Sequence, residues 1–515
     1  MLALRRAFAT AARARPPRTP KRHKLSELRP GELPKLDFTN PEAPGAASGA
    51  FESPPLSRGL LGMLQALLGV RARPTTPQAH ALAHMFSDGW GPRPAPAATL
   101  IAAETGSGKT LAYLLPLLQK LHDTRALTEH ADRRHAARSK PRLMPRAVVL
   151  APTHELARQI AGVAKALSHH PEHKLRVACT STPGYEGALE RDLARLGETG
   201  GAPASPDVLV ATPGRLVELC ADVAPPAGMS APSWRPLSLR NLQSVVIDEA
   251  DTLLDKGFGP TTHALLAALA PINVRVDVVF VSATIPKTLS EYLDEHYSVR
   301  TTLASPQLHS LPEKLRATFV DPGSDRHLAV LREVLRVFTT PGSERDQILI
   351  FRDRRGGVEG LAAYLRERNV DVVALTGDAE RRSTRTNADL ACFLVDPRRA
   401  SGGGSGGSGS SDGPRVLITT SLLSRGLDFG PDVRHVLLPD AGREGSRSAH
   451  AANNNALELL HRAGRSARAG RAGHVVLFDR ASAPGRSKVL LNRAGKRRGI
   501  IRGQMDLLVR ELRRK

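Results

Sequence analysis

The sequence predicts two tandem α/β domains, each built around a parallel β-sheet. The first observation is a repeated order along the chain, in which β-branched runs such as ATLIAA and RAVVLA directly precede helical patterns. The second is that this alternation occurs in two series, separated by a Pro-containing stretch at residues 302–316. The third is the length of 515 residues, which corresponds to about three domain equivalents and suffices for two hydrophobic cores.

The first domain is predicted to span residues 50–303. Its expected strands begin with ATLIAA, directly before the helical pattern KTLAYLLPLLQKL, and continue with RAVVLA, VLVAT, SVVIDE and VDVVFVSA. The second domain is predicted at residues 317–484, after a linker at 304–316, with strands at QILIF, DVVAL, RVLITT, RHVLLP and HVVLF. Residues 401–411, SGGGSGGSGSS, form a flexible insertion in this domain, which is tolerated because loop-closure entropy grows only logarithmically with length.

The composition favours a nucleic-acid partner and excludes several protein classes. Lys and Arg number 73 against 50 Asp and Glu, which leaves a net charge of +23. No uncharged apolar stretch reaches about 18 residues, so we expect no membrane span. Cys179, Cys220 and Cys392 form no C-x-x-C pair, which excludes a disulfide framework or a zinc ribbon and favours a reducing compartment. With only 4% aromatic residues, phosphate and sugar contacts are favoured over base stacking.

Both ends of the chain are basic. Residues 1–26 contain eight Lys or Arg and no acid, with arginines spaced among Ala and Leu as in a mitochondrial presequence. A disordered basic arm that binds nucleic acid is the alternative interpretation. We expect residues 1–49 to be a presequence and disordered arm, and residues 485–515, with eleven Lys or Arg, to form a basic tail.

A phosphate-binding loop is predicted at residues 103–110, AETGSGKT. It follows the first strand and directly precedes a helical pattern, which is the order that such loops require. Two glycines let backbone N–H groups face phosphate oxygens at the helix N-terminus, the Lys reaches the β and γ phosphates, and the Thr hydroxyl binds Mg²⁺. The cofactor-binding residues expected from this loop are Ala103, Thr105, Gly106, Ser107, Gly108, Lys109 and Thr110.

Two acids follow the apolar strand SVVI, at the strand end where ligands of open parallel sheets bind. Asp248 is suited to hold Mg²⁺ through water, and Glu249 to orient and deprotonate an attacking water. Acids after strands often only cap the next helix. Because a phosphate loop with Lys109 is also present, we interpret Lys109, Asp248 and Glu249 as catalytic residues.

These segments resemble the DEAD-box ATP-dependent RNA helicases of superfamily two. The resemblance rests on motifs that stand in the family's order: PTTPQ at 74–78, AETGSGKT at 103–110, PTHELARQ at 152–159, TPGRL at 212–216, DEAD at 248–251, SAT at 282–284, LIFRD at 349–353, LTGD at 375–378, TTSLLSRGLDF at 419–429 and HRAGRSARAG at 461–470. It extends over both predicted domains and implies RecA-like folds, ATP with Mg²⁺ as cofactors, and RNA as a partner.

The resemblance implies roles for further residues. Gln78 would read the adenine edge, with Phe51 as a stacking partner whose alternative role is that of a core aromatic. Asp428 would contact the ribose, and Arg465 and Arg468 would be arginine fingers at the γ phosphate. The residues implied to couple the phosphate site to RNA are Asp251, Ser282, Thr284, His461 and Arg462. The residues implied to bind RNA are Pro152, Thr153, Arg158, Thr212, Gly214, Arg215, Phe351, Thr376, Gly377, Thr420 and Arg425.

The second domain departs from the family pattern. Ser421 stands where the family usually has Asp, Thr376 where it usually has His, and SAR where TGR is usual. We expect these differences to change how RNA is held and to leave the ATP chemistry intact.

The resemblance and the basic N-terminus together imply a monomeric ATP-dependent RNA helicase that locally unwinds or remodels RNA in the mitochondrial matrix. We expect mitochondrial ribosomal RNA and ribonucleoprotein particles as partners, during assembly of the large ribosomal subunit, because the basic tail and the insertions suit docking on such a particle. An ATP-gated RNA clamp or assembly factor without true unwinding is the alternative. A DNA helicase is disfavoured, because the spelling of the motifs and the Gln78 element resemble the RNA branch.

Overall fold

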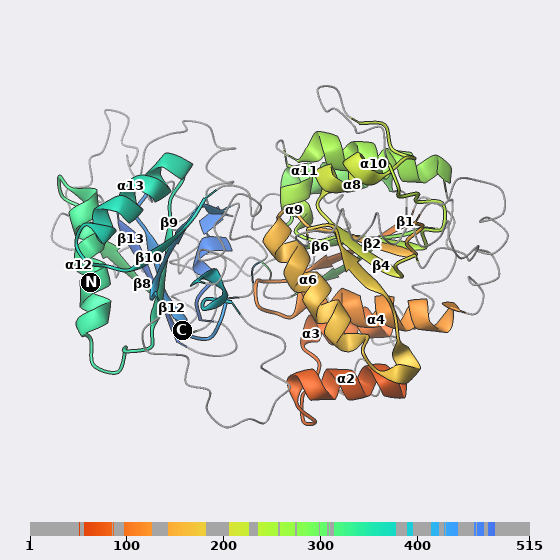
Figure 1. Cartoon of the computed structure of the whole chain (residues 1–515), viewed down its shortest axis with the longest axis horizontal. Helices are drawn as coiled ribbons and strands as arrows, with labels where there is room; N and C mark the ends of the chain where they lie inside the picture. Colours follow the sequence, from red (N-terminus) through yellow and green to blue (C-terminus); the bar gives the residue numbers. More distant parts are fainter. Residues whose placement is uncertain are drawn as a thin grey trace, which may run out of the picture.

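The computed structural model contains two α/β domains that lie side by side, so the predicted fold class is confirmed (Figure 1). The structure describes residues 51, 56–84, 86, 97–125, 143–181, 205–225, 235–255, 258–272, 276–297, 299–305, 308, 314–376, 389–394, 414–421, 427, 429–440, 458–459, 461–467 and 472–478. The expected presequence, Gly/Ser insertion and basic tail lie outside these residues, as do four predicted site residues, Gly377, Arg425, Asp428 and Arg468.

The first domain contains a seven-stranded parallel sheet with the strand order β3-β4-β2-β5-β6-β1-β7. Its strands are β1 (Ala97–Ala102), β2 (Ala147–Leu150), β3 (Val177–Cys179), β4 (Val208–Ala211), β5 (Ser244–Ile247), β6 (Asp277–Ser282) and β7 (Val299–Ala304). Its helices are α2 (Arg58–Leu68), α3 (Thr76–His84), α4 (Lys109–Asp123), α6 (His154–Leu167), the 3₁₀ helix η3 (Pro171–His173), α8 (Pro213–Leu219), α9 (Ala250–Leu253), α10 (Gly259–Ile272) and α11 (Lys287–His296).

Helices cover both faces of this sheet, which explains why its central strands are apolar throughout. β2, β4 and β5 are buried at every position, as expected for parallel strands with a helix layer on each side. Helices α2, α3, α4 and α6 pack on one face, and α8, α9, α10 and α11 on the other, with a separate hydrophobic cluster on each side (Figure 1).

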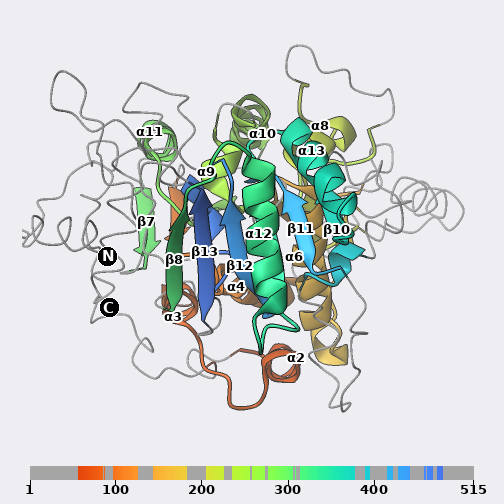
Figure 2. The same ribbon diagram turned by 90° about the vertical axis from the view of Figure 1, so that its left-hand side faces the viewer.

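The second domain contains a six-stranded parallel sheet with the order β10-β11-β9-β12-β13-β8. Its strands are β8 (Leu315–Val320), β9 (Gln347–Phe351), β10 (Val372–Leu375), β11 (Val416–Thr419), β12 (Val433–Leu438) and β13 (Gly473–Phe478), and its long helices are α12 (Arg326–Thr339) and α13 (Arg355–Arg366). Both helices lie on the same face of the sheet (Figure 2). The Asp325 side chain begins α12 by accepting bonds from the N–H groups of His327 and Leu328.

The start of the second domain differs from its predicted position. Strand β8 begins at Leu315, inside the expected linker, and pairs with β13 along its whole length. The sequence pattern did not indicate this strand because it lies at the edge of the sheet and alternates between buried and exposed side chains. Among the described residues, no helix is both long enough and apolar enough to cross a membrane.

Candidate functional site

The first-domain segments that are predicted to carry the chemistry lie side by side at the carboxyl ends of the strands of the first sheet. In the spatial order β4-β2-β5-β6-β1, the carboxyl ends of the strands lead into TPG at 212–214, PTH at 152–154, DEAD at 248–251, SAT at 282–284 and the loop at 103–110. Carboxyl ends of parallel strands are where ligands bind in such sheets. In this row of segments, the predicted RNA-binding segments therefore come first, the phosphate loop comes last, and the predicted coupling segments lie between them.

The phosphate loop is closed by its own backbone and by the start of α4. Gly108 precedes α4 in the left-handed conformation, with φ of 84°. The Lys109 ammonium is buried and donates to the carbonyls of Ala103 at 2.9 Å and Glu104 at 3.1 Å. The Ser107 hydroxyl donates to the same Glu104 carbonyl at 2.7 Å. The loop is thus a compact cradle whose Lys lies at its base.

The Gln78 side chain packs directly against this loop. Its Nε2 donates to the Gly108 carbonyl at 3.1 Å, and its Oε1 accepts the Thr75 N–H at 3.0 Å. The Thr75 hydroxyl donates to the Ser107 carbonyl at 2.7 Å. A Cβ atom at Gly108 would lie only 2.2 Å from Gln78 Nε2, so the close contact requires Gly at that position. Gln78 therefore contacts the phosphate loop directly. Its contact with adenine stays a prediction.

The two carboxylates predicted to be catalytic are buried at the end of β5. Asp248 Oδ2 accepts the Tyr113 hydroxyl at 2.9 Å, and Oδ1 accepts the Glu249 N–H at 2.9 Å. Glu249 has a φ of 50°, which is unusual for a residue other than Gly and typical of functional sites. Both side chains are only 4% exposed. The strand end and this backbone conformation together hold two carboxylates beside the phosphate loop.

The burial of these charges shifts their pKa values in opposite directions. Burial and the neighbouring Glu249 charge raise the pKa of Asp248 to about 7, against the Tyr113 hydrogen bond and Lys109, which favour the carboxylate. Burial lowers the pKa of Lys109, with a smaller contribution of the same sign from Arg465 of the second domain. Burial and Asp248 raise the pKa of Tyr113. Arg465 of the second domain therefore lies near enough to Lys109 to act on its charge.

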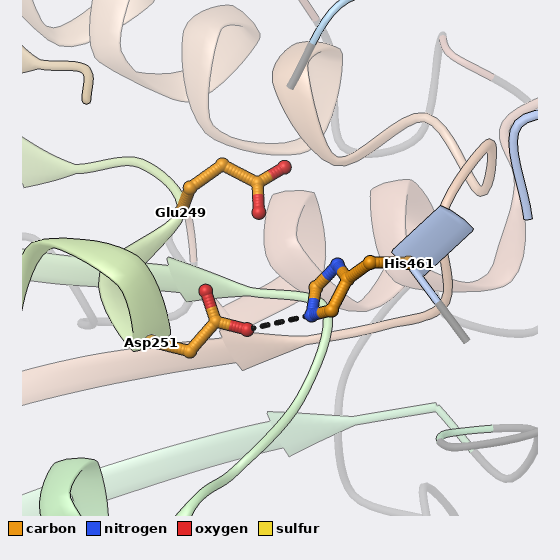
Figure 3. A group of neighbouring side chains, drawn as sticks. All are labelled: Glu249, Asp251 and His461. Carbon is orange, nitrogen blue, oxygen red and sulfur yellow. Dashed lines mark ion pairs between the residues drawn. The ribbon is translucent and has the colours of Figure 1, made fainter. Parts of the chain in front are cut away.

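Asp251 connects the two domains (Figure 3). Its carboxylate accepts the Thr284 hydroxyl, and one of its oxygens lies 3.1 Å from Nε2 of His461 in the second domain. The Ser282 hydroxyl donates to the Thr284 carbonyl at 2.6 Å, which ties the end of β6 into the same network. A second link across the domains runs from the Thr105 hydroxyl to the Gly464 carbonyl at 3.2 Å. Four of the five predicted coupling residues, Asp251, Ser282, Thr284 and His461, therefore lie in one network at the domain interface, whereas Arg462 contacts residues of its own domain.

The second domain presents Arg465 in a fixed orientation. Its Nε donates to the His461 carbonyl at 3.0 Å and its Nη1 to the Leu427 carbonyl at 3.1 Å, with the side chain buried. The segment that carries it turns at Ala467, with φ of 58°, and passes so close to β13 that a Cβ atom at Gly473 would lie 2.4 Å from the Ala467 nitrogen. The start of β13 thus positions the Arg465 segment.

Arg462 has anionic partners although Ser421 replaces the usual Asp. Its Nε donates to the Ser421 hydroxyl at 2.5 Å, and its Nη2 contacts the carboxylates of Asp353 at 2.9 Å and Glu458 at 2.6 Å. The guanidinium also lies 5.7 Å from the centre of the Phe351 ring. Two other carboxylates therefore provide the negative charge that position 421 lacks.

Comparison with known proteins agrees with this geometry. The DEAD/DEAH box helicase model matches residues 75–292, which include the predicted phosphate loop and the two predicted catalytic carboxylates. This part of the chain thus has the sequence of a DEAD/DEAH box helicase domain. The chain is 31% identical over 417 residues to "ATP-dependent RNA helicase MRH4, mitochondrial" of Candida glabrata, covering 73% of this chain and 66% of that protein. The protein of the same name from Pyricularia oryzae is 28% identical, with 71% of this chain and 57% of that protein covered.

Solved structures share the fold of the two α/β domains. The structure of Saccharomyces cerevisiae Dbp5 bound to RNA and ADP BeF3 has a TM-score of 0.56 at 21% identity, covering 84% of this chain and 89% of that one. The structure of Mss116 bound to ssRNA and UDP-BeF has a TM-score of 0.57 at 20% identity, covering 82% and 73%. The match to the MRH4 proteins spans less than two thirds of their length, with 57% covered in Pyricularia oryzae and 66% in Candida glabrata.

The described residues that are predicted to bind RNA lie at the carboxyl ends of strands in the two sheets. Thr153 begins α6 with its hydroxyl accepting the Leu156 N–H, and Arg158 one turn later donates to the Ser181 carbonyl at 2.7 Å. In the next segment, Arg215 pairs with Glu218 at 2.7 Å. The remaining first-domain residues of this group, Pro152, Thr212 and Gly214, lie at the same sheet edge.

In the second sheet, Phe351, Thr376 and Thr420 follow or end the adjacent strands β9, β10 and β11. Phe351 is fully buried in the core, so its ring is not part of the surface in this arrangement. Phe51, similarly, is 4% exposed within the hydrophobic cluster of α2, α3 and α4, which is the alternative role expected for it. The RNA and adenine contacts of these two residues stay predictions.

Sequence reasoning missed Tyr113, Thr75, Asp353 and Glu458. Tyr113 could have been found, because it lies four residues after Lys109 and therefore on the same face of α4. Thr75 belongs to the PTTPQ segment that the sequence already indicated. Asp353 belongs to the LIFRD segment that the sequence also indicated. Glu458 carried no comparable signal, because nothing in its local sequence distinguishes it from other acids before the fold brings it to Arg462.

Proposed function

We propose that this chain is an RNA-stimulated ATPase that locally unwinds or remodels RNA in mitochondria. The observation that carries the proposal is the meeting of Lys109, Asp248 and Glu249 of the first domain with Arg465 of the second in one buried, electrostatically coupled cluster. The match to the helicase family model and the name of the MRH4 relatives, mitochondrial ATP-dependent RNA helicases, support the substrate class and the compartment.

In this proposal, ATP binds with its phosphates on the loop at 103–110. Lys109 exchanges its two carbonyl partners for phosphate oxygens, and the N-terminus of α4 adds its partial positive charge. Glu249 orients a water for in-line attack on the γ phosphorus and takes its proton, while the bond from that phosphorus to the bridging oxygen breaks. Arg465, and by prediction Arg468, stabilise the charge on the transferred phosphoryl group.

The residues at the loop fit a Mg²⁺ ion, which prefers oxygen ligands. The Thr110 hydroxyl and the Asp248 carboxylate are the groups that would hold it, and the Tyr113 hydroxyl donates to that carboxylate at 2.9 Å. When bound, the ion would neutralise phosphate charge. Because Tyr113 donates to Asp248, it holds that carboxylate in place for the ion.

Asp251 couples this chemistry to RNA. It contacts Thr284 beyond the end of β6 and His461 in the second domain, so closure of the domains requires the two networks to fit together. RNA bound along the predicted residues of both sheets would favour the closed arrangement, and ATP would favour it as well. An RNA strand held across both domains could not stay in a regular duplex. Binding would therefore separate a few base pairs locally.

The finer substrate in this proposal is mitochondrial ribosomal RNA, within ribonucleoprotein particles of the large subunit in the matrix, with the protein acting as a monomer. The net charge of +23 and the basic tail support docking on a large polyanion. Depletion of the protein should then reduce mature mitochondrial large subunits. Normal mitochondrial ribosomal particles after depletion would remove this preference.

The test of the activity is steady-state ATP hydrolysis with and without single-stranded RNA at fixed salt. We expect RNA to stimulate the wild-type protein. Glu249→Gln should lose turnover by about 100-fold or more while still binding ATP, because the base is lost and the phosphate contacts remain. Turnover near wild type in Glu249→Gln would contradict the assignment of Glu249.

A strand-displacement assay beside a filter-binding assay separates unwinding from clamping. A helicase displaces a short strand in an ATP-dependent manner. ATP-dependent retention of RNA without displacement would favour the clamp, which uses the same ATP site and the same interface between domains.

A further inference from the structure

We infer that Glu249, Asp251 and His461 form a binding site for one divalent transition-metal ion, with Zn²⁺ as the best-fitting member of that class, and that this ion locks the two domains together. The site is distinct from the expected Mg²⁺ position at Thr110 and Asp248. Ion binding depends only on the geometry described below. The inhibition that would follow from it rests on the proposed function.

The three side chains converge from two domains (Figure 3). Glu249 and Asp251 follow β5 of the first domain, and His461 belongs to the second. One ligand atom from each lies within 4.8 Å of the others, and all three residues are buried. Among the described residues, this is the one group of three or more His, Cys, Asp or Glu with such a spacing.

Two of these side chains have an atom available for a ligand. Within the part of the chain that the structure describes, Glu249 Oε2 and His461 Nδ1 have no hydrogen-bond partner. Both residues are only 4% exposed, and burying a polar atom without a partner is costly. Figure 3 shows the Glu249 carboxylate and the His461 ring facing the same space. A cation there would satisfy the carboxylate and the imidazole at the same time.

The mixture of ligands selects the kind of ion. Imidazole nitrogen suits Zn²⁺ and its neighbours in the first transition row, whereas Mg²⁺ and Ca²⁺ prefer oxygen alone. Ligands of a tetrahedral zinc ion, with bonds of about 2.0 Å, lie about 3.3 Å apart. The ligand atoms of the three residues already lie within 4.8 Å of one another, and rotations of the Glu249 and His461 side chains would bring the unpartnered Oε2 and Nδ1 to this spacing. Water would occupy the fourth position.

Charge also favours a cation at this place. Asp248, Glu249 and Asp251 supply three carboxylates, and Lys109 and Arg465 are the cations that act on the same cluster. When the three carboxylates are ionised, one negative charge remains in excess. A divalent ion between Glu249 and His461 would compensate it.

The position of the site gives the ion two effects. Because its ligands come from both domains, bound Zn²⁺ would stabilise the closed arrangement. Because it engages the Glu249 carboxylate, the same ion would stop that residue from taking a proton from water. Zinc would therefore trap the enzyme closed and inactive, and a chelator would release it.

The first test is Zn²⁺ binding to the full-length protein, measured by competition with a chromophoric chelator in the presence of excess Mg²⁺. We expect His461→Gln and Asp251→Asn each to bind one equivalent fewer than wild type, with an affinity loss of about 100-fold or more at this site, since even loss of an outer partner costs 10–100-fold. Two variants are used so that misfolding of one, detected by circular dichroism, leaves the test intact.

His435→Gln is the matched control. His435 is also a histidine with a carboxylate partner, Asp346 at 3.1 Å, but it lies on β12, away from the interface and outside the three-ligand group. It should keep the wild-type number of zinc equivalents. Equal zinc binding by wild type, His461→Gln and Asp251→Asn, or displacement of the zinc by Mg²⁺, would overturn the proposal.

The second test measures the distance between the domains. Spin labels on Cys392 in the second domain and on Gly162→Cys in α6, where an added side chain meets nothing within 4 Å, report this distance. Zn²⁺ without nucleotide should narrow the distance distribution in the labelled wild-type background and leave it unchanged with His461→Gln. Zinc binding with no such narrowing would contradict the lock. ATP hydrolysis is measured in a separate experiment without zinc. A protein that hydrolyses no ATP there, but still binds Zn²⁺ and closes with it, would contradict the proposed function alone.

Discussion

In the first domain, the charged groups of the site are held mainly by the segments that carry them, whereas in the second domain they are held by distant segments. Lys109 donates to carbonyls five and six residues before it, and Asp248 accepts the N–H of the next residue. Arg465, by contrast, depends on the Leu427 carbonyl, and Arg462 on Asp353. Each half also has a bond of the other kind, because Asp248 accepts the distant Tyr113 hydroxyl and Arg465 donates to the His461 carbonyl nearby in the sequence. The Lys109 contacts are therefore encoded locally, whereas the orientation of the arginines requires a complete domain fold.

This difference predicts two kinds of defect. Changes in the first domain should alter binding of ATP and Mg²⁺ and the stability of the loop. Changes in the second should spare nucleotide binding and slow turnover, because Arg465 acts on charge that develops in the transition state.

The largest effect should come from Arg465→Ala. We expect kcat for RNA-stimulated ATP hydrolysis to fall by about 10³-fold, as for arginine fingers in other nucleotide hydrolases, with little change in ATP affinity. Single-turnover hydrolysis and fluorescent-nucleotide binding check the two parts. A large loss of nucleotide affinity with unchanged kcat would break the proposed division between the domains.

Gly473→Ala should disturb the Arg465 segment from outside the site. The added Cβ would lie 2.4 Å from the backbone nitrogen of Ala467, which cannot turn away as a side chain could. We expect a cost of about 1–3 kcal/mol in unfolding free energy and a lower kcat. Thermal unfolding and ATPase rates measure both effects. Gly360→Ala is the control, because an added Cβ there meets nothing within 4 Å.

Gly108→Ala is the corresponding change in the first domain. It places a side chain at φ of 84° and pushes a Cβ into the Gln78 amide. We expect about 1–3 kcal/mol of destabilisation and weaker ATP binding. Adding Gln78→Ala should relieve the steric part and leave the backbone strain. Identical stability in the single and double variants would mean that contact with Gln78 costs nothing.

Tyr113→Phe should weaken the hold on Asp248 without changing the packing. The loss of one hydrogen bond to a charged group costs about 1.5–3 kcal/mol, and the pKa of Asp248 should rise further because that bond favours the carboxylate. We expect the Mg²⁺ concentration for half-maximal ATPase activity to rise about tenfold. Magnesium titrations at constant ATP measure this change, and an unchanged midpoint would show that Tyr113 serves packing alone.

The pH dependence of stability offers the finest test of the first-domain half. Because the folded-state pKa of Asp248, about 7, lies above its ordinary value of 3.8, the folded protein binds more protons between these values. The preference of the folded state for the protonated Asp248 carboxyl therefore contributes to the free energy of unfolding. This contribution is fully present below the ordinary pKa and is lost as the pH rises through the folded-state pKa. Asp248→Asn should lose less stability than wild type over this range, by a few degrees in Tm at about 2–4 °C per kcal/mol. If the Tm of wild type and of Asp248→Asn changed with pH in the same way, Asp248 would not be the group responsible.

The fold could be predicted where strands are apolar on both faces, and not where they lie at an edge. Central strands such as β2 and β5 stand in the sequence as uninterrupted buried runs. The edge strand β8 alternates in burial and follows a Pro-containing stretch, so its first residues are predicted as linker. An edge strand is recognised only when its partner, β13, is in place.

The same distinction applies to the site. The phosphate loop and the two carboxylates could be predicted because each stands at a strand end, and all strand ends of a parallel sheet meet at one edge. The partners of Arg462 could not, because the LIFRD motif does not say which residue Asp353 contacts, and Glu458 is an ordinary acid until the fold brings the two within 2.9 Å and 2.6 Å of the guanidinium.

By itself, the sequence determined the two α/β domains, the loop before α4, the two acids after β5 and the resemblance to a helicase family, because strand–loop–helix order and motif spelling are local properties of the chain. Only the tertiary structure decided that Tyr113 holds Asp248, that Gln78 packs on Gly108, and that Glu249, Asp251 and His461 converge. Such contacts depend on strand order and on how the two domains meet, and neither property can be read from neighbouring residues.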